Sequence, residues 1–292
     1  MPELPEVQSI VDTLAASVNG RRIERVTLGR ADYVTPPTID LPRQLLGRHI
    51  RSISRRAKRV VVQLDDGNRF YIHLGMSGRL TVEAPENPTA RHTHLILDLD
   101  DSRQIRLCDP RRFGGVFWMG ANAHENSLGP EPLEMSAGEL FSALLKTRRA
   151  IKVALLDQKL IAGIGNIYAD EALFEASIHP KMRSERISAE QARRLDGAIK
   201  RVLRRAIRHK GSTLRDYVNA DGQRGAFQKL HRVYGRGGLP CLRCGTNLRR
   251  IVLGGRSTVF CPKCQSAKLL TKQINPPIRF PRSARASAAP RE

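Results

Sequence analysis

Four cysteines near the C-terminal end restrict this chain to folds that bring two short segments together. Two Cys-x-x-Cys pairs, with sixteen residues between them, supply Cys241, Cys244, Cys261 and Cys264. Two such knuckles suit the tetrahedral coordination of Zn²⁺ by four thiolates, and the residues between them can form a hairpin. A redox dithiol would need neither the second pair nor this spacing. Because sulfur fills all four ligand positions, the pattern predicts one structural zinc ion rather than a catalytic metal.

Hydrophobic periodicity predicts a β-rich first half behind an N-terminal helix. Apolar residues recur at helical spacing from Leu4 to Val18, which predicts a helix over residues 4–18 that stops at Asn19-Gly20. A period of two follows, which is typical of strands. The expected strands cover residues 23–29, 49–55, 59–65, 69–74, 78–84, 94–100 and 104–108, with turns at Asp66-Gly67 and Asp101-Ser102. This pattern indicates a two-layered antiparallel structure with the first helix against its sheets.

From about residue 136 the apolar spacing becomes helical. Helices are predicted over residues 137–147, 151–157, 167–175 and 189–209. Ser188 and Gln191 form a capping box at the start of the last helix, and Gly211 marks its end. The expected division is a β domain over 1–135, a helical domain over 136–235, a cysteine-bearing unit over 236–265 and a tail over 266–292. The tail is rich in Pro, Ala, Ser and Arg, which predicts a basic disordered segment.

Charge is distributed unevenly along the chain, which has a formal net charge of +22. Residues 1–145 hold 18 basic and 18 acidic side chains, whereas residues 146–292 hold 32 and 10. This asymmetry predicts a polyanionic partner, for which nucleic acid is the first candidate and an anionic membrane surface is the second. A membrane-surface role would need bulky apolar anchors, but the apolar residues of the 189–209 helix serve its own core. The sequence shows neither a bilayer-spanning apolar run nor a signal peptide, so we expect a cytoplasmic protein without a membrane partner.

The N-terminal sequence Pro2-Glu3-Leu4-Pro5-Glu6 places a nucleophile beside two carboxyl groups. A small residue at position 2 favours removal of Met1, which would leave the secondary amine of Pro2 free. Such an amine can condense with a sugar carbon to give an iminium, and it is neutral more often than a lysine because terminal amines titrate near ~8. Glu3 and Glu6 lie within a turn of it, where proton transfer needs them. The alternative is that both acids only stabilise the start of the helix.

Two further segments offer sites for phosphate. Residues 161–171 form a glycine-punctuated turn that opens a helix, so free N–H groups and the Asn166 side chain could make a phosphate-binding corner. The same turn could equally join two packed helices. Arg256 lies in the segment 254–260 between the cysteine pairs, where a zinc-stapled hairpin would hold its guanidinium for a phosphate. Alone, Arg256 could also be ordinary surface charge.

These features occur together in one known family. The chain resembles formamidopyrimidine-DNA glycosylase, the bacterial repair enzyme of the helix–two-turn–helix glycosylases. The matching stretches are Pro2–Val7, Arg55–Arg59 with Lys58, His73–Gly78, Asp109–Gly114, Gly163–Glu171, Val233–Arg236 and the four cysteines with Arg256. They run in the family's order over residues 2–265. The resemblance implies an α+β multidomain fold, with an antiparallel β-sandwich, a helix–two-turn–helix domain, a four-cysteine zinc-finger β-hairpin and DNA in the cleft between.

The resemblance also implies the mechanism of a bifunctional glycosylase and AP lyase of base excision repair. Pro2 would attack C1′ of a damaged nucleotide flipped out of the duplex, Glu3 would be the acid–base group, and Glu6 would support the site by hydrogen bonding. Elimination at both flanking phosphates would leave a gap in the strand. The residues that match the family's phosphate contacts are Lys58, His73, Asn166 and Arg256, with Lys159 near the site. Those that match the residues filling the hole left by the flipped base are Met76, Arg111 and Phe113, with the arginine facing the orphaned cytosine.

The expected substrate is duplex DNA containing oxidised purines, namely 8-oxoguanine and formamidopyrimidines, bound by a monomer. The sister endonuclease VIII class, which prefers oxidised pyrimidines, is the nearest alternative. Leu4, together with Arg111 and Phe113, favours the purine branch. The alternative outside the enzymes is a zinc-containing protein that binds damaged DNA without catalysis. Such a protein would not require an N-terminal Pro-Glu beside Lys58.

One segment departs from the common family pattern. Residues 219–228 align with the loop that closes over the flipped base, and Ala226 stands where an aromatic residue often accompanies the phenylalanine. The departure concerns the details of base recognition and not the type of reaction.

Overall fold

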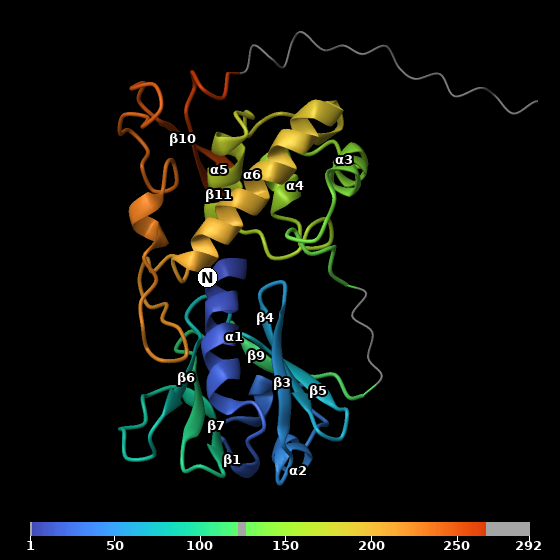
Figure 1. Cartoon of the computed structure of the whole chain (residues 1–292), viewed down its shortest axis with the longest axis vertical. Helices are drawn as coiled ribbons and strands as arrows, with labels where there is room; N and C mark the ends of the chain where they lie inside the picture. Colours follow the sequence, from blue (N-terminus) through green and yellow to red (C-terminus); the bar gives the residue numbers. More distant parts are fainter. Residues whose placement is uncertain (1, 122–126, 267–292) are drawn as a thin grey trace, which may run out of the picture.

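The computed structural model describes residues 2–121 and 127–266, which form two domains along the long axis of the molecule (Figure 1). The β domain occupies one end, and the helical domain with the cysteine-bearing hairpin occupies the other. Within the described residues, no helix combines the length and the apolar character needed to cross a membrane. Apart from residue 266, the predicted tail lies outside the described residues.

Two sheets form the β-sandwich, as the alternating pattern predicts. The first is antiparallel throughout, in the order β1 (Ile23–Leu28), β7 (Thr93–Leu99), β8 (Gln104–Cys108) and β6 (Arg79–Glu83). The second has the order β2 (Val34–Thr35), β9 (Gly115–Trp118), β5 (Arg69–His73), β4 (Arg59–Leu64) and β3 (Ile50–Arg56). Alternate side chains of β4 are buried, as expected for a strand with one face on a core.

One pairing contradicts the expectation of a purely antiparallel domain, because β2 runs parallel to β9. The sequence pattern predicts neither of these strands, nor the short helix α2 (Leu41–Leu45). Their lengths of two, four and five residues are too short to show a period of two or of 3.6. The predicted hairpin turns do occur, with left-handed backbone at Gly67 and Ser102.

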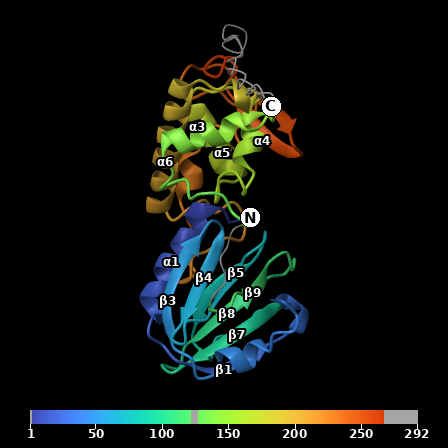
Figure 2. The ribbon, with the colours of Figure 1, turned by 90° about the vertical axis from the view of Figure 1, so that its right-hand side faces the viewer.

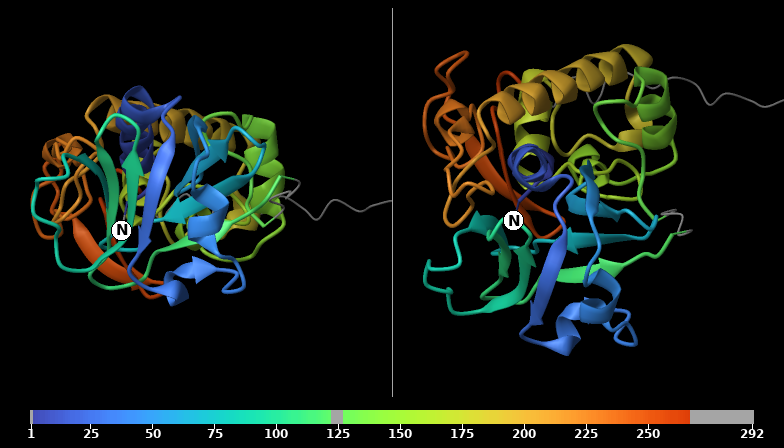
Figure 3. Two further views of the ribbon diagram at one scale, coloured as in Figure 1. Left: turned by 90° about the horizontal axis from the view of Figure 1, so that it is seen from below. Right: turned by 60° about the horizontal axis from the view of Figure 1, so that its bottom comes forward.

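Helix α1 (Leu4–Val18) joins the two domains and has the predicted bounds. From Val7 onward its apolar side packs into the core of the sandwich, whereas Leu4 is buried in the core of the helical domain. The right-hand view of Figure 3 shows α1 nearly end-on, between α6 and the strands. The first turn of the chain therefore lies at the junction of the domains.

The helical domain is built from α3 (Ala137–Leu145), α4 (Ile151–Leu155), α5 (Asn166–Glu175) and α6 (Ala189–Arg208), close to the predicted ranges. The expected capping box is present, since Ser188 Oγ accepts the Gln191 N–H at 3.2 Å and the Gln191 side chain accepts the Ser188 N–H at 2.9 Å. Strands β10 (Arg249–Leu253) and β11 (Arg256–Phe260) form the hairpin between the cysteine pairs. Helix α5 packs against both α6 and β11. As a result, α6 and the hairpin lie on opposite sides of the domain (Figure 2).

Candidate active site

The carboxylate of Glu3 is buried at the junction of the domains, with 3% of the residue exposed. It accepts backbone N–H groups from the start of α5, those of Gly165 at 2.8 Å, Ile167 at 2.9 Å and Tyr168 at 3.4 Å. A Cβ atom on Gly165 would lie 2.3 Å from Glu3 Cδ, so this position admits only glycine while Glu3 keeps its place. The N-terminus of a helix favours a negative charge, which stabilises Glu3 in this position.

This arrangement corrects the expectation of a phosphate-binding corner at residues 161–171. The N–H groups that a phosphate would use are already bonded to Glu3, a residue more than 160 positions away in the sequence. The segment is therefore both a turn between packed helices and the binding site for an internal carboxylate. Asn166 itself begins α5, and its side-chain Oδ1 is buried and has no hydrogen-bond partner within the described part of the chain.

The second acid, Glu6, ties the start of α1 to the helical domain. Its carboxylate accepts the backbone N–H of Glu3 at 2.8 Å and that of Ser212 at 2.7 Å, and it also accepts the hydroxyl of Tyr168. Gly211 has a left-handed backbone, and a Cβ atom there would lie 2.6 Å from Glu6 Oε1. Glu6 thus fixes the backbone at Glu3 from one side while Tyr168 contacts both acids.

The electrostatic environment favours protonated forms of both acids. Burial raises the pKa of Glu3, against the opposing effects of the Lys58 charge and the backbone hydrogen bonds. Burial, followed by the charge of Glu3, raises the pKa of Glu6 to about 7. Burial lowers the pKa of Lys58, and the two acids oppose that shift. A carboxyl group with a pKa of about 7, as in Glu6, can both donate and accept a proton at physiological pH, and burial shifts the pKa of Glu3 in the same direction.

Lys58 and His73 reach this junction from the β domain. Lys58 follows Ala57, which has a left-handed backbone in the turn between β3 and β4, and only 7% of Lys58 is exposed. His73 ends β5, and burial, followed by the charge of Arg59, lowers its pKa. Its Nδ1 atom is buried without a hydrogen-bond partner in the described residues. The charge of Arg256 adds to the lowering of the Lys58 pKa by burial, so the hairpin arginine lies close enough to Lys58 for their charges to repel each other.

The predicted base-stack residues lie on two neighbouring loops of the β domain. Met76 and Phe113 are exposed by 44% and 56%, and the guanidinium of Arg111 lies over the Phe113 ring at 4.7 Å. The loops touch so closely that a Cβ atom on Gly75 would lie 2.4 Å from the Phe113 carbonyl carbon. Lys159, by contrast, is exposed in the turn after α4, with its backbone N–H bonded to Asp157.

Sequence reasoning missed the residue that organises these loops. Asp109 is fully buried and accepts hydrogen bonds from the Ser77 hydroxyl at 2.7 Å, the Gly114 N–H at 2.8 Å and the Tyr33 hydroxyl at 3.0 Å. These bonds, largely with Ser77 and Gly114, hold the pKa of Asp109 below its usual value despite burial. Its position at the start of the Asp109–Gly114 motif is the one sequence signal that could have indicated this role.

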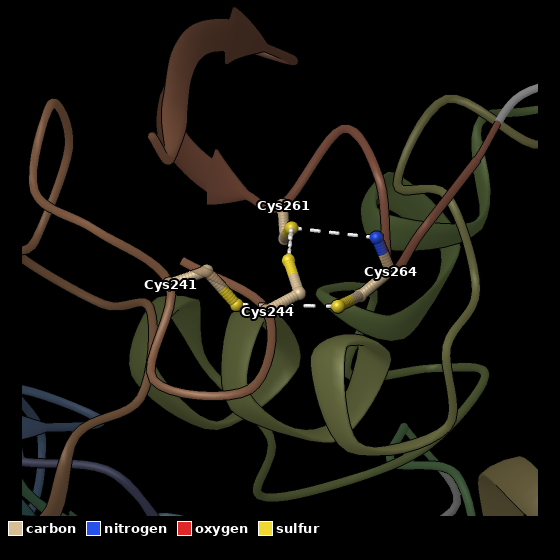
Figure 4. Close-up of side chains that lie close together, drawn as sticks. All are labelled: Cys241, Cys244, Cys261 and Cys264. Atoms are coloured by element: carbon tan, nitrogen blue, oxygen red, sulfur yellow. Dashed lines mark hydrogen bonds between the residues drawn. The ribbon is translucent and has the colours of Figure 1, made fainter. Parts of the chain in front are cut away.

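Four cysteine side chains converge on one point behind the hairpin (Figure 4). Their Sγ atoms all lie within 4.8 Å of one another, and two pairs are separated by 3.5 and 4.0 Å. Zn–S bonds of about 2.3 Å in a tetrahedron place the sulfur atoms roughly 3.8 Å apart, so the cluster fits zinc. The N–H groups of Arg243 and Cys264 point at Cys241 Sγ and Cys261 Sγ, as donors to thiolates do. The four cysteines would together hold one structural zinc ion, with no ligand position left for water.

A buried ion pair that the sequence does not reveal supports the hairpin. Lys152 Nζ lies 2.7 Å from Asp170 Oδ1, and both side chains are at most 1% exposed. Lys152 also donates to the Ser257 carbonyl and the Thr258 hydroxyl, each at 2.8 Å. These contacts anchor β11 directly beside Arg256 and thereby fix the hairpin on α4 and α5.

Family models match three successive parts of the chain. The N-terminal domain of formamidopyrimidine-DNA glycosylase matches residues 1–116, the H2TH domain of the same enzyme matches 128–218, and the zinc finger found in FPG and IleRS matches 238–267. Together with the fold and the cysteine cluster, these matches define a zinc-containing, DNA-binding glycosylase of base excision repair. The chain belongs to the formamidopyrimidine-DNA glycosylase family.

Full-length relatives and solved structures agree with this assignment. The formamidopyrimidine-DNA glycosylases of Gluconobacter oxydans and Bacillus subtilis are 46% and 41% identical, over 91% and 92% of this chain and all of each relative. The Lactococcus lactis enzyme in complex with abasic-site DNA is 32% identical, with a TM-score of 0.85 over 91% of this chain and all of that one. The Thermus thermophilus MutM (Fpg) structure is 38% identical, with a TM-score of 0.81 over 90% and 98% of the two chains.

Proposed function

We propose that this chain is a bifunctional glycosylase and AP lyase that removes 8-oxoguanine and formamidopyrimidines from duplex DNA as a monomer. The observation that carries the proposal is the buried Glu3 carboxyl, held at the N-terminus of α5 directly after Pro2. A carboxyl with a raised pKa next to a terminal secondary amine supplies an acid–base group and a nucleophile in one place. The known DNA complexes of the relatives are consistent with this role.

In the proposed reaction the Pro2 nitrogen forms a bond to C1′ of the flipped nucleotide while the bond from C1′ to the base breaks, and the base leaves with the proton that the Pro2 nitrogen loses. Glu3 protonates the ring oxygen of the sugar, so the ring opens and a cationic iminium joins Pro2 to the DNA. The ionised Glu3 then accepts the C2′ proton as the 3′ phosphate leaves, and a second elimination, with loss of the C4′ proton, expels the 5′ phosphate. Glu6 keeps Glu3 in place through the backbone N–H of Glu3.

The remaining predicted residues have positions that suit roles in DNA binding. The charges of Lys58 and Arg256 act on each other at the junction, and both residues would hold phosphates on either side of the lesion. The charge of Lys58 also acts on Glu3, so Lys58 is close enough to assist proton transfer. Asn166, with Oδ1 unpartnered within the described residues, and His73, with Nδ1 unpartnered there, would each turn a ring or amide N–H toward a phosphate oxygen. Lys159 would contact the backbone from its exposed turn. Met76, Arg111 and Phe113 protrude from the β domain, as residues that replace a flipped base must.

Covalent trapping tests the proposal directly. Borohydride should reduce the iminium on a duplex with 8-oxoguanine opposite cytosine, and the cross-linked peptide should begin at Pro2. Pro2→Gly should trap more slowly, because a primary amine gives an imine that is neutral unless it gains a further proton. A cross-link at a lysine, or no cross-link despite binding, would overturn the proposed nucleophile and favour a damage-binding protein without catalysis.

Substrate choice has its own comparison. Single-turnover release of 8-oxoguanine should be faster than release of thymine glycol, each opposite its normal partner. Faster release of the glycol would assign the chain to the endonuclease VIII-like alternative.

Replacing Arg256 with alanine should weaken binding to every duplex, damaged or undamaged. Loss of one phosphate contact should reduce the slope of log K against log salt by about 0.9. Arg43→Ala, which removes an exposed arginine from α2 at the far end of the β domain, is the matched control and should leave the slope unchanged. An unchanged slope for the Arg256 variant would remove this residue from the phosphate contacts.

A further inference from the structure

The outer side of α6 carries an unusual density of arginine. Successive residues of an α-helix turn by ~100°, which places five of its arginines within an arc of about 100° and along about 22 Å of the helix. We call these residues the α6 arginine face: Arg193, Arg194, Arg201, Arg204 and Arg208, all of which are exposed. The opposite side of α6 is apolar and buried in the helical core.

Most of this charge is not neutralised within the protein. Arg194 pairs with Glu190 and Arg201 pairs with Glu175, each at 2.6 Å. Arg193, Arg204 and Arg208 have no carboxylate partner among the described residues. Arg205 differs from them, because it turns inward over the Phe227 ring.

The three arginines of the α6 arginine face without a carboxylate partner, Arg193, Arg204 and Arg208, cost the fold stability, and no ion pair within the described residues offsets that cost. Like charges four positions apart on a helix, such as Arg204 and Arg208, destabilise it by about 0.2–0.5 kcal/mol per pair. An anionic partner would remove this repulsion and gain charge-assisted hydrogen bonds from each guanidinium.

The α6 arginine face also points away from the proposed active site. Helix α5 lies between α6 and β11, and Arg256 begins β11 on the other side of the domain (Figure 2). A duplex held by Lys58 and Arg256 therefore lies on the far side of α5 from α6. The arginines of α6 are free to bind something else while that duplex is in place.

We propose that the α6 arginine face binds the phosphate backbone of a second DNA duplex, so that one protein bridges two DNA segments. A straight row of cations over about 22 Å follows about two thirds of a helical turn of B-DNA and needs no base contacts. Such contacts give sequence-independent affinity with dissociation constants of roughly 10⁻⁴–10⁻⁶ M at physiological salt. The inference rests on DNA binding at the proposed active site, and an acidic protein partner is the other outcome that the test distinguishes.

A two-colour binding experiment tests the bridge. The full chain is first saturated with a duplex that carries a stable abasic-site analogue and one dye. A second, undamaged duplex with another dye is then titrated, and complexes with both dyes are counted. The test variant is Arg193→Gln/Arg204→Gln/Arg208→Gln. The control variant is Arg22→Gln/Arg43→Gln/Arg51→Gln, which removes the same charge from exposed positions at the far end of the β domain. Melting temperatures check that both variants are folded.

The wild type and the control should bind the second duplex equally. The α6 variant should bind it at least about tenfold more weakly, with a salt slope lower by about 2.7, which corresponds to three phosphate contacts. Equal binding of the second duplex by the α6 variant, or the absence of two-colour complexes with the wild type, would overturn the proposal. Binding of labelled polyglutamate by the wild type but not by the α6 variant, without two-colour complexes, would assign the face to an acidic protein instead. The dye on the first duplex reports whether that duplex binds at all. If it does not bind, the result counts against the proposed active site alone.

Discussion

Replacing Glu3 with glutamine should slow the release of 8-oxoguanine by about 10²- to 10⁴-fold, the usual contribution of an acid–base group. Glutamine has the same shape, and its one amide oxygen can still accept the Gly165 and Tyr168 N–H groups that Glu3 Oε2 accepts, whereas the Ile167 N–H loses its acceptor. The amide cannot donate an acidic proton to the sugar. Binding to a duplex with an abasic-site analogue should stay about the same, because the proposed phosphate contacts of Lys58 and Arg256 are unchanged. Single-turnover kinetics and equilibrium binding measure the two effects separately.

The matched control for this variant is Glu139→Gln. Glu139 is also a carboxylate at the start of a helix, where it accepts the backbone N–H and the hydroxyl of Ser136, but it is exposed on α3 and far from the junction. The Glu139→Gln variant should excise the base at the wild-type rate. Wild-type excision by the Glu3 variant would show that proton transfer belongs to another group, and Glu6 would then be the first candidate.

Replacing Cys244 with serine should release the zinc ion and weaken DNA binding by roughly 10- to 100-fold. The apolar core of the hairpin is small and comprises Phe174, Val233, Cys241, Leu248, Val259 and Cys261, so it depends on the metal for its fold. Loss of that fold displaces Arg256, and a charged hydrogen bond to phosphate contributes about 1.5–3 kcal/mol. The sandwich has a separate core and should keep its strand content.

Metal analysis and binding titrations on the same protein samples measure this prediction. Cys108→Ser is the control, because Cys108 is a buried cysteine of β8 outside the cluster. It should keep one zinc ion per chain and wild-type affinity. A full complement of zinc in the Cys244 variant would contradict the four-sulfur assignment.

Local signals were sufficient to predict most of the secondary structure. Helices α1 and α6 have long apolar stripes and clear ends, and strands β4 and β5 alternate between buried and partly buried side chains. Strands β2 and β9 and helix α2 were missed because two to five residues carry no readable period. The parallel pairing of β2 with β9 is a long-range contact, and nothing in either segment specifies it.

Site residues were predictable where a short motif is typical of one kind of chemistry. Contacts between residues that are far apart in the sequence were not predictable. Cysteine spacing revealed the metal cluster, and Pro2-Glu3 suggested a nucleophile with its acid. The role of the N–H groups of α5 stayed open between a phosphate site and a turn between packed helices, because the sequence does not show that Glu3 binds them. The buried pair of Lys152 and Asp170 was missed for the same reason, since each residue alone resembles an ordinary helical charge.

The anchoring of Glu3 and Glu6 by residues 165–212 has a consequence for the order in which the molecule matures on the ribosome. Glu6 emerges among the first residues, yet its partner Ser212 is translated 206 residues later, after roughly 10–40 s of synthesis. Until then the nascent chain can close its sandwich and Glu3 can meet α5, but Glu6 lacks one of the contacts that fix the start of α1. The residues of the proposed site are thus among the first to be made and among the last to be fixed in place, so an incomplete polypeptide lacks the assembled site.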